Sequence, residues 1–422
     1  MKSFKFIHAA DLHLDSPFKG LTDIPQSIKQ QLLKSTFQAF SRLIDQAIHH
    51  NVSFIVISGD LFDAEQRSLR AQLFLFEQFE RLKAHHIHVY LIHGNHDPIS
   101  EKQSSFQFGS HVHIFNSNEV TMQPAYHEDE LVAYIYGISY GEKAVYNNLA
   151  KQYFKQDDDV FHLALYHGSV GSSQEHEPYA PCSVQDLVVH QYDYVALGHI
   201  HKPQVLYDDT LIVYSGNIQG RHRKENGERG CYLVEVNNQK STKLTFLPLA
   251  TIQWENIAVD CSHISDEQQL IFTLQREIHK ECTKDGQCYM LTLELYGTTA
   301  LHQILKSSEK QRDVLEALRS LFPIEDSWIY ISKLKIETSM SYNKAALIAE
   351  EQFLQKLVEK YEQFKLRPTD EMLQIKELEL LLQHHDLSRL LPQLHRKIVH
   401  SAIEDGLNEI LDLFAQEKGR EL

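Results

Sequence analysis

Five short motifs in the first half of the chain carry residue types that bind divalent metal ions. Imidazole nitrogens and carboxylate oxygens together form the ligand set that such ions prefer in proteins. In chain order the candidate ligands are Asp11 and His13 in DLH, Asp60 in GD, Asn95 in GNHD, His167 in YHGS, and His199 and His201 in GHIH. Each motif is weakly specific by itself, but all five in this order predict a metal centre.

The candidates divide into two sets that can hold a pair of ions. Two cations roughly 3.5 to 4 Å apart need a carboxylate between them, and the single aspartate of GD, Asp60, is the natural bridge. The expected sets are Asp11, His13 and His201 on one ion, and Asn95, His167 and His199 on the other. Residues two apart on a strand point to one face, so the DLH and GHIH pairs are each expected to approach from one side.

Such a pair of ions predicts hydrolysis of a phosphate ester. Water between the ions loses a proton near neutral pH, and the resulting metal-bridging hydroxide can attack phosphorus in line. His96, next to the ligand Asn95, is expected to contact a phosphoryl oxygen or to protonate the leaving alkoxide. Asp97 is expected to hold the His96 imidazole in the right tautomer, so both are candidate catalytic residues.

The elements that must position these residues alternate between strands and helices. Apolar runs end directly on Asp11, Asp60 and Asn95, and helical patterns over about 35–50 and 68–85 separate the runs. That alternation predicts βαβ units, whose functional groups gather beyond the carboxyl ends of the strands. Strand-like runs dominate residues 131–249 and suggest a second sheet packed on the first.

Beyond the catalytic region, residues 251–338 show no cluster of metal-ligand types. Residues 251–338 read as a small α/β unit with helices over about 267–281 and 306–321, and residues 339–422 read as amphipathic helices. We therefore expect three domains: a catalytic domain over 1–250, a capping domain over 251–338 and a helical segment over 339–422. The helical segment either docks a partner or forms a bundle of its own.

The composition limits the class of protein. The 422 residues include 57 acidic and 41 basic side chains, for a formal charge of −16, so any contact with nucleic acid must be local. No apolar run is long enough to span a membrane, and no secretion signal is recognisable at the start, which predicts a cytoplasmic protein without membrane attachment. The five cysteines form no paired motif and are expected to be reduced.

One loop concentrates positive charge. The segment GRHRKENGERG holds Arg221, Arg223, Lys224 and Arg229, which can bind phosphate oxygens without reading bases. The alternative is a solvated loop whose cations pair with Glu225 and Glu228.

The motifs, in this order over residues 4–201, resemble the calcineurin-like metallophosphoesterases. The flanking text IHAADLHLDSPF, GDLFDAE, HGNHDP and LGHIHKPQ resembles the SbcD- and YhaO-type DNA-repair exonucleases, and YSGNIQGRHRKENGERGCYLVEV is most similar to the YhaO type. The resemblance implies an α+β fold, a four-layer αββα sandwich with a small capping domain. In some relatives a histidine follows the GD aspartate by three positions; here that residue is Asp63, and no catalytic role is expected of it.

The same resemblance implies a metal-dependent DNA nuclease in DNA repair, with exonuclease activity and endonuclease activity as a further expectation. It implies two divalent ions, Mn²⁺ by family, DNA as substrate, an SbcC-like ATPase partner and a homodimer. Two alternatives stay open from the residues: a phosphodiesterase or phosphatase acting on a small phosphate ester, and a non-catalytic subunit that binds DNA ends or an ATPase.

Overall fold

The computed structural model describes residues 2–18, 24–63, 68–99, 108–171, 179–340, 344–365 and 396–419, and in the last range it describes side chains at 401–415 and 417. The chain forms two compact units. Unit 1 comprises residues 1–258, 275–294 and 314–335, and unit 2 comprises residues 259–274, 295–313 and 336–422. The division into three domains that the sequence suggests stays a prediction.

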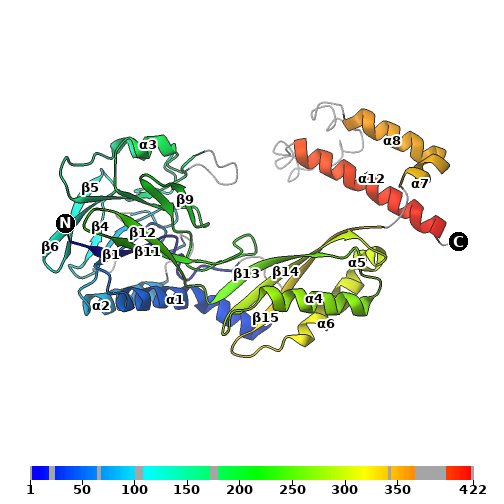
Figure 1. Ribbon diagram of the computed structural model, residues 1–422, viewed down its shortest axis with the longest axis horizontal. Helices are drawn as coiled ribbons and strands as arrows, with labels where there is room; N and C mark the ends of the chain where they lie inside the picture. The colour runs from blue at the N-terminus through cyan, green and yellow to red at the C-terminus, as the bar shows by residue number, and fades with distance from the viewer. Residues whose placement is uncertain are drawn as a thin grey trace. The chain divides into compact units, whose positions relative to one another are not determined.

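Two six-stranded sheets form the centre of unit 1 (Figure 1). The first sheet has the order β12-β11-β1-β2-β3-β4, and β1, β2, β3 and β4 run parallel. Its strands are β1 (Phe4–Ala9), β2 (Phe54–Ser58), β3 (His88–Ile92), β4 (Val112–Ile114), β11 (Gly230–Val236) and β12 (Thr242–Pro248). Every residue of β2 is buried, as expected of a strand that is covered on both faces and is apolar except for its last residue, Ser58.

The second sheet has the order β5-β6-β7-β8-β10-β9, with a parallel centre formed by β6, β7, β8 and β10. Its strands are β5 (Thr121–His127), β6 (Glu130–Gly137), β7 (Phe161–His167), β8 (Tyr194–Gly198), β9 (Gln204–Tyr207) and β10 (Leu211–Tyr214). Phe6 and Phe54 of the first sheet share one apolar core with Leu163 and Tyr194 of the second. The two sheets therefore pack face to face.

Helices cover the outer face of each sheet. On the first sheet, α1 (Gln26–His49) and α2 (Leu69–Lys83) enclose a core that includes Phe40 and Phe79. On the second, α3 (Val184–Val188) and a 3-10 helix (Leu149–Gln152) pack on Tyr166 and its neighbours. Figure 1 shows α1 and α2 on one side of the sheets and α3 on the other. The predicted four-layer αββα sandwich is confirmed.

Two details differ from the sequence-based expectation. The runs at the end of 131–249 do not join the second sheet, because β11 pairs antiparallel with the edge of β1, with Phe4 opposite Val236. Helix α1 begins at Gln26, well before the predicted start near residue 35, because Ile28 and Leu32 pack into a core with Trp254 and Trp328. Both differences depend on contacts with distant parts of the chain.

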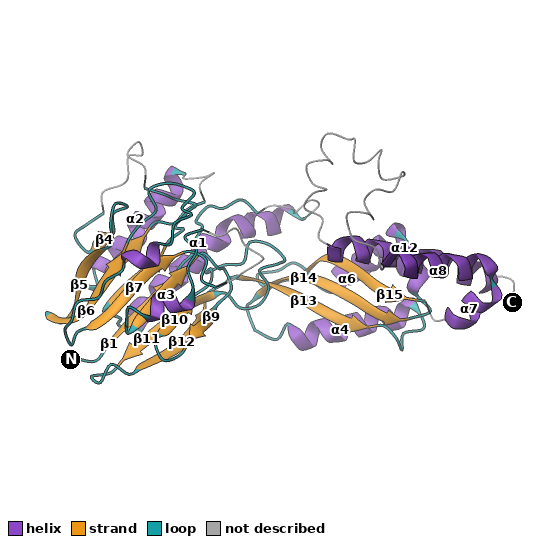
Figure 2. Cartoon of the chain, turned by 90° about the horizontal axis from the view of Figure 1, so that it is seen from above, coloured by secondary structure: helices purple, strands orange, loops and turns teal. Residues whose placement is uncertain are grey.

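A three-stranded sheet follows, with the order β13-β14-β15 (Figure 2). Its elements are β13 (Ile252–Asp260), α4 (Glu267–Glu281), β14 (Cys288–Thr298), α5 (His302–Lys306), α6 (Ser308–Leu321) and β15 (Ile329–Ser339). This matches the small α/β unit expected there, except that the second helix is divided into α5 and α6.

Helices α7 (Lys344–Glu350), α8 (Gln352–Lys365) and α12 (Arg396–Gly419) belong to unit 2. Leu354 of α8 packs with Leu407 and Leu411 of α12, so at least part of their apolar faces is used within the chain. The predicted helical segment also includes residues 366–395, which lie outside the described residues. Among the described helices, none combines the length and apolar character needed to cross a membrane.

Candidate metal centre

The predicted ligands lie where parallel strands of the two sheets end. Asp11 and His13 follow β1, Asp60 follows β2, Asn95 follows β3, His167 closes β7, and His199 and His201 follow β8. Because the carboxyl ends of neighbouring parallel strands meet at one edge of a sheet, residues far apart in sequence come together there. Histidine and asparagine limit the negative charge that the aspartates bring to this edge.

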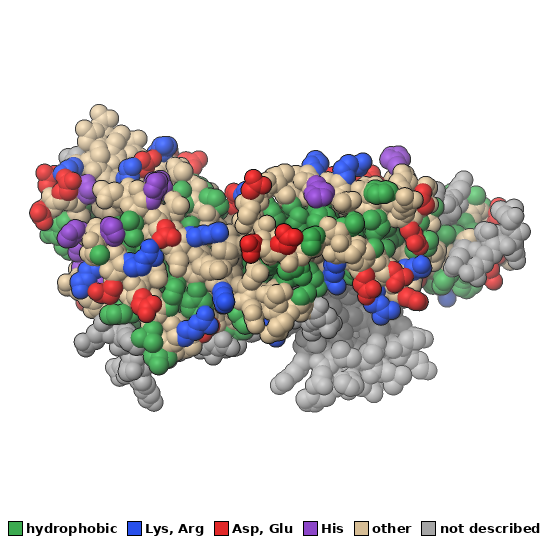
Figure 3. Space-filling view, turned by 90° about the horizontal axis from the view of Figure 1, so that it is seen from below, with side chains coloured by type: hydrophobic (Ala, Val, Ile, Leu, Met, Phe, Trp, Pro, Cys, Tyr) green, Lys and Arg blue, Asp and Glu red, His purple; other side chains and the backbone are tan. Residues whose placement is uncertain are grey.

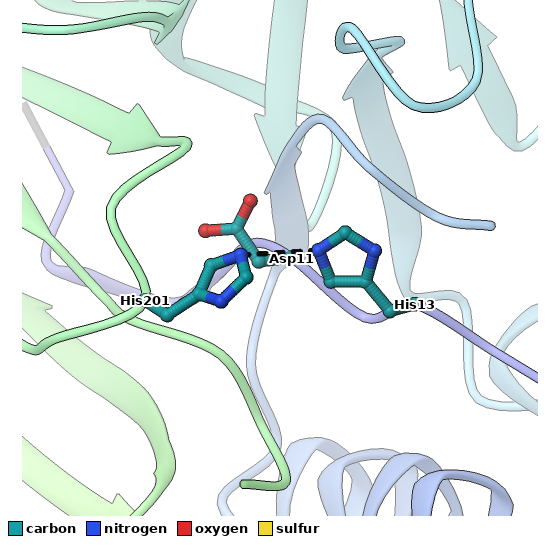
Figure 4. A group of neighbouring side chains, drawn as sticks. All are labelled: Asp11, His13 and His201. Carbon is teal, nitrogen blue, oxygen red and sulfur yellow. Dashed lines mark hydrogen bonds between the residues drawn. The ribbon is translucent and has the colours of Figure 1, made fainter. Parts of the chain in front are cut away.

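The first predicted set converges. Nε2 of His13 lies 3.1 Å from Nε2 of His201. A carboxylate oxygen of Asp11 and one nitrogen from each histidine all lie within 4.8 Å of one another. Figure 4 shows the His13 and His201 rings facing each other with Asp11 beside them, and His201 arrives from a different segment than Asp11 and His13.

The second predicted set also converges, around the side-chain oxygen of Asn95. Nε2 of His167 lies 3.0 Å from Asn95 Oδ1, and Nδ1 of His199 lies 3.2 Å from the same oxygen. These are distances at which one cation can replace the hydrogen bonds and be held by several of the atoms.

Asp60 lies between the two sets. Its Oδ2 is 3.7 Å from Nε2 of His13 in the first set and 3.5 Å from Nε2 of His167 in the second. Asp11, Asp60 and His167 form a further group whose ligand atoms lie within 4.8 Å of one another. This is the position that a bridging carboxylate must occupy.

The side chains of the DLH and GHIH pairs do not owe their direction to the alternation of residues along a strand, which the sequence had suggested. Strand β1 ends at Ala9, and Asp11 and His13 lie in the following loop with φ of 52° and 41°. Asp60 and His199 also have positive φ, at 53° and 96°. Such values are uncommon for residues with a side chain, and they concentrate at functional sites. The left-handed backbone therefore turns these side chains inward.

Backbone contacts hold the loops after β1 and β2 together. The Asp11 amide donates to the Gly59 carbonyl at 3.1 Å, and the His13 amide donates to the Asp60 carbonyl at 3.0 Å. Gly94 allows the third loop to approach: a Cβ at this position would lie 2.3 Å from Asp60 Oδ1 and 2.6 Å from His167 Nε2. The glycine of GNHD is thus required by the space the ligands occupy.

His96 lies beside the centre, and its ring partner is Asp63 instead of the expected Asp97. The His96 ring is 4.9 Å from the His13 ring, and its main-chain amide donates to Asp60 Oδ1 at 2.9 Å. Nδ1 of His96 lies 3.3 Å from Asp63 Oδ1. That hydrogen bond raises the pKa of His96, and the same contact keeps the pKa of Asp63 well below its usual range.

Asp97 has a structural role. Its buried carboxylate accepts hydrogen bonds from the amides of Leu61 at 2.9 Å and Gly94 at 2.8 Å, and it lies 3.1 Å from Nδ1 of His93. Asp97 therefore ties the loop after β2 to the loop after β3. The expectation that it orients His96 is corrected, because its oxygens face the backbone of these loops.

The basic loop divides into engaged and exposed residues. Nη1 of Arg221 donates to Ser16 and to Asp63, at 3.0 and 3.2 Å. Arg229 is buried and donates to main-chain oxygens, including that of His201. Arg223 and Lys224 are exposed. Arg221 and Arg229 are engaged within the protein, so the four cations do not form one phosphate-binding loop. Arg223 and Lys224 are the exposed cations that a polyanion can reach.

Two further groups orient ligands and were not identified from the sequence. The Ser58 carbonyl accepts a hydrogen bond from Nδ1 of His167 at 2.8 Å, which leaves Nε2 directed at the centre. A Glu225 oxygen lies 2.5 Å from Nδ1 of His201. No local pattern marks a carbonyl as an orienting group. In the sequence, Glu225 stands out only as an acidic residue within a basic loop. That position suggests pairing with the cations of the loop and does not indicate contact with His201.

The charge of the site fits divalent cations. Burial and the neighbouring Asp60 carboxylate raise the pKa of Asp11, and burial lowers the pKa of His13. Nδ1 of His13 is buried and has no hydrogen-bond partner among the described residues. Buried carboxylates crowded beside neutral imidazoles are costly by themselves and favourable around a cation, so these residues suit bound metal ions.

Comparisons with known proteins agree with this geometry. Residues 4–203 match the family model described as calcineurin-like phosphoesterase, and residues 254–339 match the middle domain of metallophosphoesterase YhaO. The uncharacterized metallophosphoesterase YhaO of Bacillus subtilis (strain 168) is 39% identical over 340 residues, which cover 80% of this chain and 83% of that protein.

More distant relatives carry a functional name. The DNA double-strand break repair protein Mre11 of Methanococcus maripaludis is 29% identical over 251 residues, covering 55% of this chain and 63% of that protein. The protein of the same name from Sulfolobus acidocaldarius is 23% identical over 331 residues, covering 75% and 81%. A dimetal phosphatase structure from Danio rerio aligns over 59% of this chain and 99% of its own, with 13% identity and a TM-score of 0.35.

Proposed function

Because this chain belongs to the calcineurin-like metallophosphoesterases and carries the middle domain of their YhaO branch, we propose that it is a manganese-dependent DNA nuclease. Family membership and the ligand cluster identify the chain as a metallophosphoesterase with a two-metal site. The observation that carries the proposal is the position of Asp60 between two converging ligand sets. The choice of DNA rests on the similarity to proteins named for DNA double-strand break repair.

Two divalent cations held here would neutralise a phosphodiester and supply a nucleophilic water at neutral pH. The chain's own residues then have distinct tasks. Asp60 contacts both ligand sets. Its carboxylate also accepts a hydrogen bond from the His96 amide at 2.9 Å, which helps to hold it between the two sets. His96 is positioned to donate a proton to the leaving oxygen, while Asp63 holds its Nδ1 side.

The exposed cations of the basic loop supply a second contact to DNA. Arg223 and Lys224 lie between Arg221, which contacts Asp63, and Glu225, which contacts His201. They therefore border the centre, where they can contact backbone phosphates without reading the sequence. In the view of Figure 3, acidic and basic side chains are interspersed among the coloured atoms, so local contacts of this kind matter more than a broad positive field.

The direct test is cleavage of end-labelled linear DNA by the purified chain with Mn²⁺. We expect Asp60→Ala and His96→Ala to abolish or strongly reduce cleavage. Asp129→Asn, a change of an exposed aspartate in the turn between β5 and β6, is the matched control and should cleave like the wild type.

Two results contradict the nuclease proposal in different ways. Hydrolysis of bis(p-nitrophenyl) phosphate without cleavage of any DNA end identifies a small phosphate ester as the substrate class. Binding of DNA that is unaffected by chelation, without hydrolysis of either substrate, identifies a non-catalytic subunit. A homodimer and an SbcC-like ATPase partner stay part of the same proposal, and gel filtration with and without such a partner tests them.

A further inference from the structure

Glu225 is a buried carboxylate beside the metal centre. Only 5% of the residue is exposed, although it lies in the loop between β10 and β11 together with the exposed Arg223 and Lys224. Its Oε1 lies 2.5 Å from Nδ1 of His201. Its Oε2 accepts hydrogen bonds from Asn217 Nδ2 at 3.0 Å and from the Arg221 amide at 2.7 Å. Both oxygens are therefore held in place.

The other nitrogen of the same imidazole faces the predicted cation. Nε2 of His201 lies 3.1 Å from Nε2 of His13 and belongs to the group formed with Asp11. A neutral imidazole carries one N–H, and a carboxylate beside Nδ1 retains the hydrogen there. The lone pair is then on Nε2, which is the nitrogen directed at the centre.

His201 needs this support more than its neighbours do. The side chains of His13 and His167 are fully buried, so packing restricts their rings, whereas the His201 side chain is 22% exposed. His167 is oriented by a neutral carbonyl, that of Ser58. A carboxylate both restricts a half-buried ring and makes the imidazole a stronger ligand.

We propose that Glu225 is a positioning residue that fixes the tautomer and ring orientation of His201 for one cation of the pair. This inference rests on the two-metal centre of the proposed function, but not on DNA being the substrate. A role limited to folding the loop, through Asn217 and Arg221, is the alternative. The two roles differ in whether metal affinity changes while the metal-free fold is preserved.

Titration of the full chain with Mn²⁺, followed through the electron paramagnetic resonance signal of the free ion, tests this. We expect the wild type to bind two ions, and Glu225→Gln to weaken one site by about tenfold with little change in the melting temperature of the metal-free protein. Glu225→Ala should weaken it further, up to about a hundredfold. Glu228→Gln is the control and should bind like the wild type. Glu228 lies in the same loop as Glu225, is half-exposed and pairs with Lys284, which lies outside the loop.

Two unweakened sites in Glu225→Gln and Glu225→Ala would overturn the inference. So would a loss of affinity that only follows a lower melting temperature of the metal-free protein. Fewer than two sites in the wild type would remove the premise and overturn it as well. By contrast, two Mn²⁺ sites without DNA cleavage would refute the nuclease proposal and leave the Glu225 result standing, so the two failures are distinguishable.

An aromatic pair beside His199 provides an independent feature. Tyr146 is 68% exposed, and its ring stacks with that of Tyr179 at a centroid distance of 6.3 Å and an interplanar angle of 17°. The Tyr179 ring meets His199 edge-on at 5.6 Å and 79°. A continuous aromatic surface thus leads from a predicted ligand to solvent.

Main-chain hydrogen bonds hold together the segments that carry the two rings. The Ala180 amide donates to the Val145 carbonyl at 2.6 Å, and the Ser169 amide donates to the Tyr179 carbonyl at 2.9 Å. Bases of any sequence can stack on such a surface, because every base has a π face. In a nucleic acid each base adjoins its own phosphate, so a phosphate at the metal centre brings a neighbouring base within reach of these rings.

We infer that Tyr146 and Tyr179 form a stacking surface for an unpaired nucleobase next to the scissile phosphate. The inference deepens the proposed function: it assigns single-stranded DNA, or an end whose terminal base is unpaired, as the substrate class. A base within a duplex has both faces covered and cannot use the surface.

Fluorescence anisotropy with a single-stranded DNA oligonucleotide tests this when its terminal linkage is a phosphorothioate that slows hydrolysis. We expect the wild type to bind the normal end about tenfold more tightly than an abasic end. Tyr146→Ala should lose this preference and Tyr146→Phe should retain it. Phe154→Ala removes another exposed aromatic residue, one that contacts His190, and is the matched control.

Equal binding of normal and abasic ends by the wild type, or an unchanged preference in Tyr146→Ala, would overturn the stacking surface. The readout requires no cleavage, so the stacking result stands apart from the nuclease test. A base preference without cleavage refutes only the nuclease proposal, and cleavage without a base preference refutes only the stacking surface.

Discussion

Nε2 of His13 lies 3.1 Å from Nε2 of His201, although the two residues are 188 positions apart in the chain. At least one of these nitrogens must carry a lone pair, and both face the carboxylate of Asp11. With Asp60 buried beside them, the site brings together groups that repel one another or lose hydration. A bound cation offsets both costs.

Metal ions are therefore expected to stabilise the folded chain. Adding Mn²⁺ should raise the melting temperature, since a ligand at 100 times its Kd adds about 2.7 kcal/mol to the free energy of unfolding. Differential scanning calorimetry before and after chelation measures the effect. Asp60→Asn should lose most of the shift and Asp129→Asn none of it. Identical melting curves with and without Mn²⁺ would contradict a built metal centre.

His96 should affect the chemical step more than metal binding. His96→Asn is expected to lower kcat by about 10²- to 10⁴-fold, the range for loss of a general acid, while two Mn²⁺ ions still bind. Asp63→Asn should lower kcat less, and the double variant should resemble His96→Asn, because the two residues act as one unit. Steady-state hydrolysis of bis(p-nitrophenyl) phosphate is the measurement. Additive losses in the double variant would show that the pair does not act together.

The exposed cations of the basic loop should contribute only through charge. Replacing Arg223 and Lys224 by glutamine is expected to weaken DNA binding equally for unrelated sequences. It should reduce the slope of log K against log salt concentration by about 1 to 2. Binding titrations over a salt series measure the slope. Lys243→Gln, a surface change on β12, serves as the comparison. An unchanged slope would place the DNA contacts elsewhere.

Gly198, the first residue of GHIH, should be intolerant of a side chain. A Cβ there would lie 1.9 Å from the Ser58 carbonyl oxygen, a main-chain atom that also accepts the His167 hydrogen bond. We expect Gly198→Ala to reduce the free energy of unfolding by about 3 kcal/mol and to weaken metal binding. Gly227→Ala meets no atom within 4 Å and should cost only about 1 kcal/mol, from its φ of +83°. Urea denaturation of both variants distinguishes a steric clash from backbone strain.

His8 should make the fold sensitive to acid. Burial lowers the pKa of His8 to about 3, and its ring nitrogens contact Tyr194 Oη and the Leu197 carbonyl. The unfolded chain binds a proton on His8 near pH 6.5 and the folded chain does not. The stability from neutral His8 is therefore present above about pH 6.5 and is lost as the pH falls toward 3.

Between pH 7 and pH 5 this loss amounts to about 2 kcal/mol. His8→Gln removes the titration, so the free energy of unfolding should fall less over that range than in the wild type. The exposed His49→Gln is the control and should follow the wild type. Urea denaturation at both pH values is the measurement, and parallel losses in His8→Gln and wild type would contradict the assignment.

The sequence by itself identified the side chains that meet at the centre and the type of fold that brings them there. Apolar runs that end on Asp11, Asp60 and Asn95 are local patterns, and local patterns are what a strand and the residue after it depend on. The family resemblance and the four-layer fold class that it implied are both confirmed. The assignment of ligands to particular ions stays a prediction, although the members of each predicted set lie close together in the structure.

Only the tertiary structure decided which groups orient those side chains. Asp63 instead of Asp97 pairs with His96, and Glu225 pairs with His201, across separations of 33 and 24 residues. Strands β11 and β12 return to the first sheet because β1 offers an open edge, and no pattern within their own sequence records that edge. Hydrogen bonds and sheet edges join residues through space, so their partners are determined only once the chain has folded.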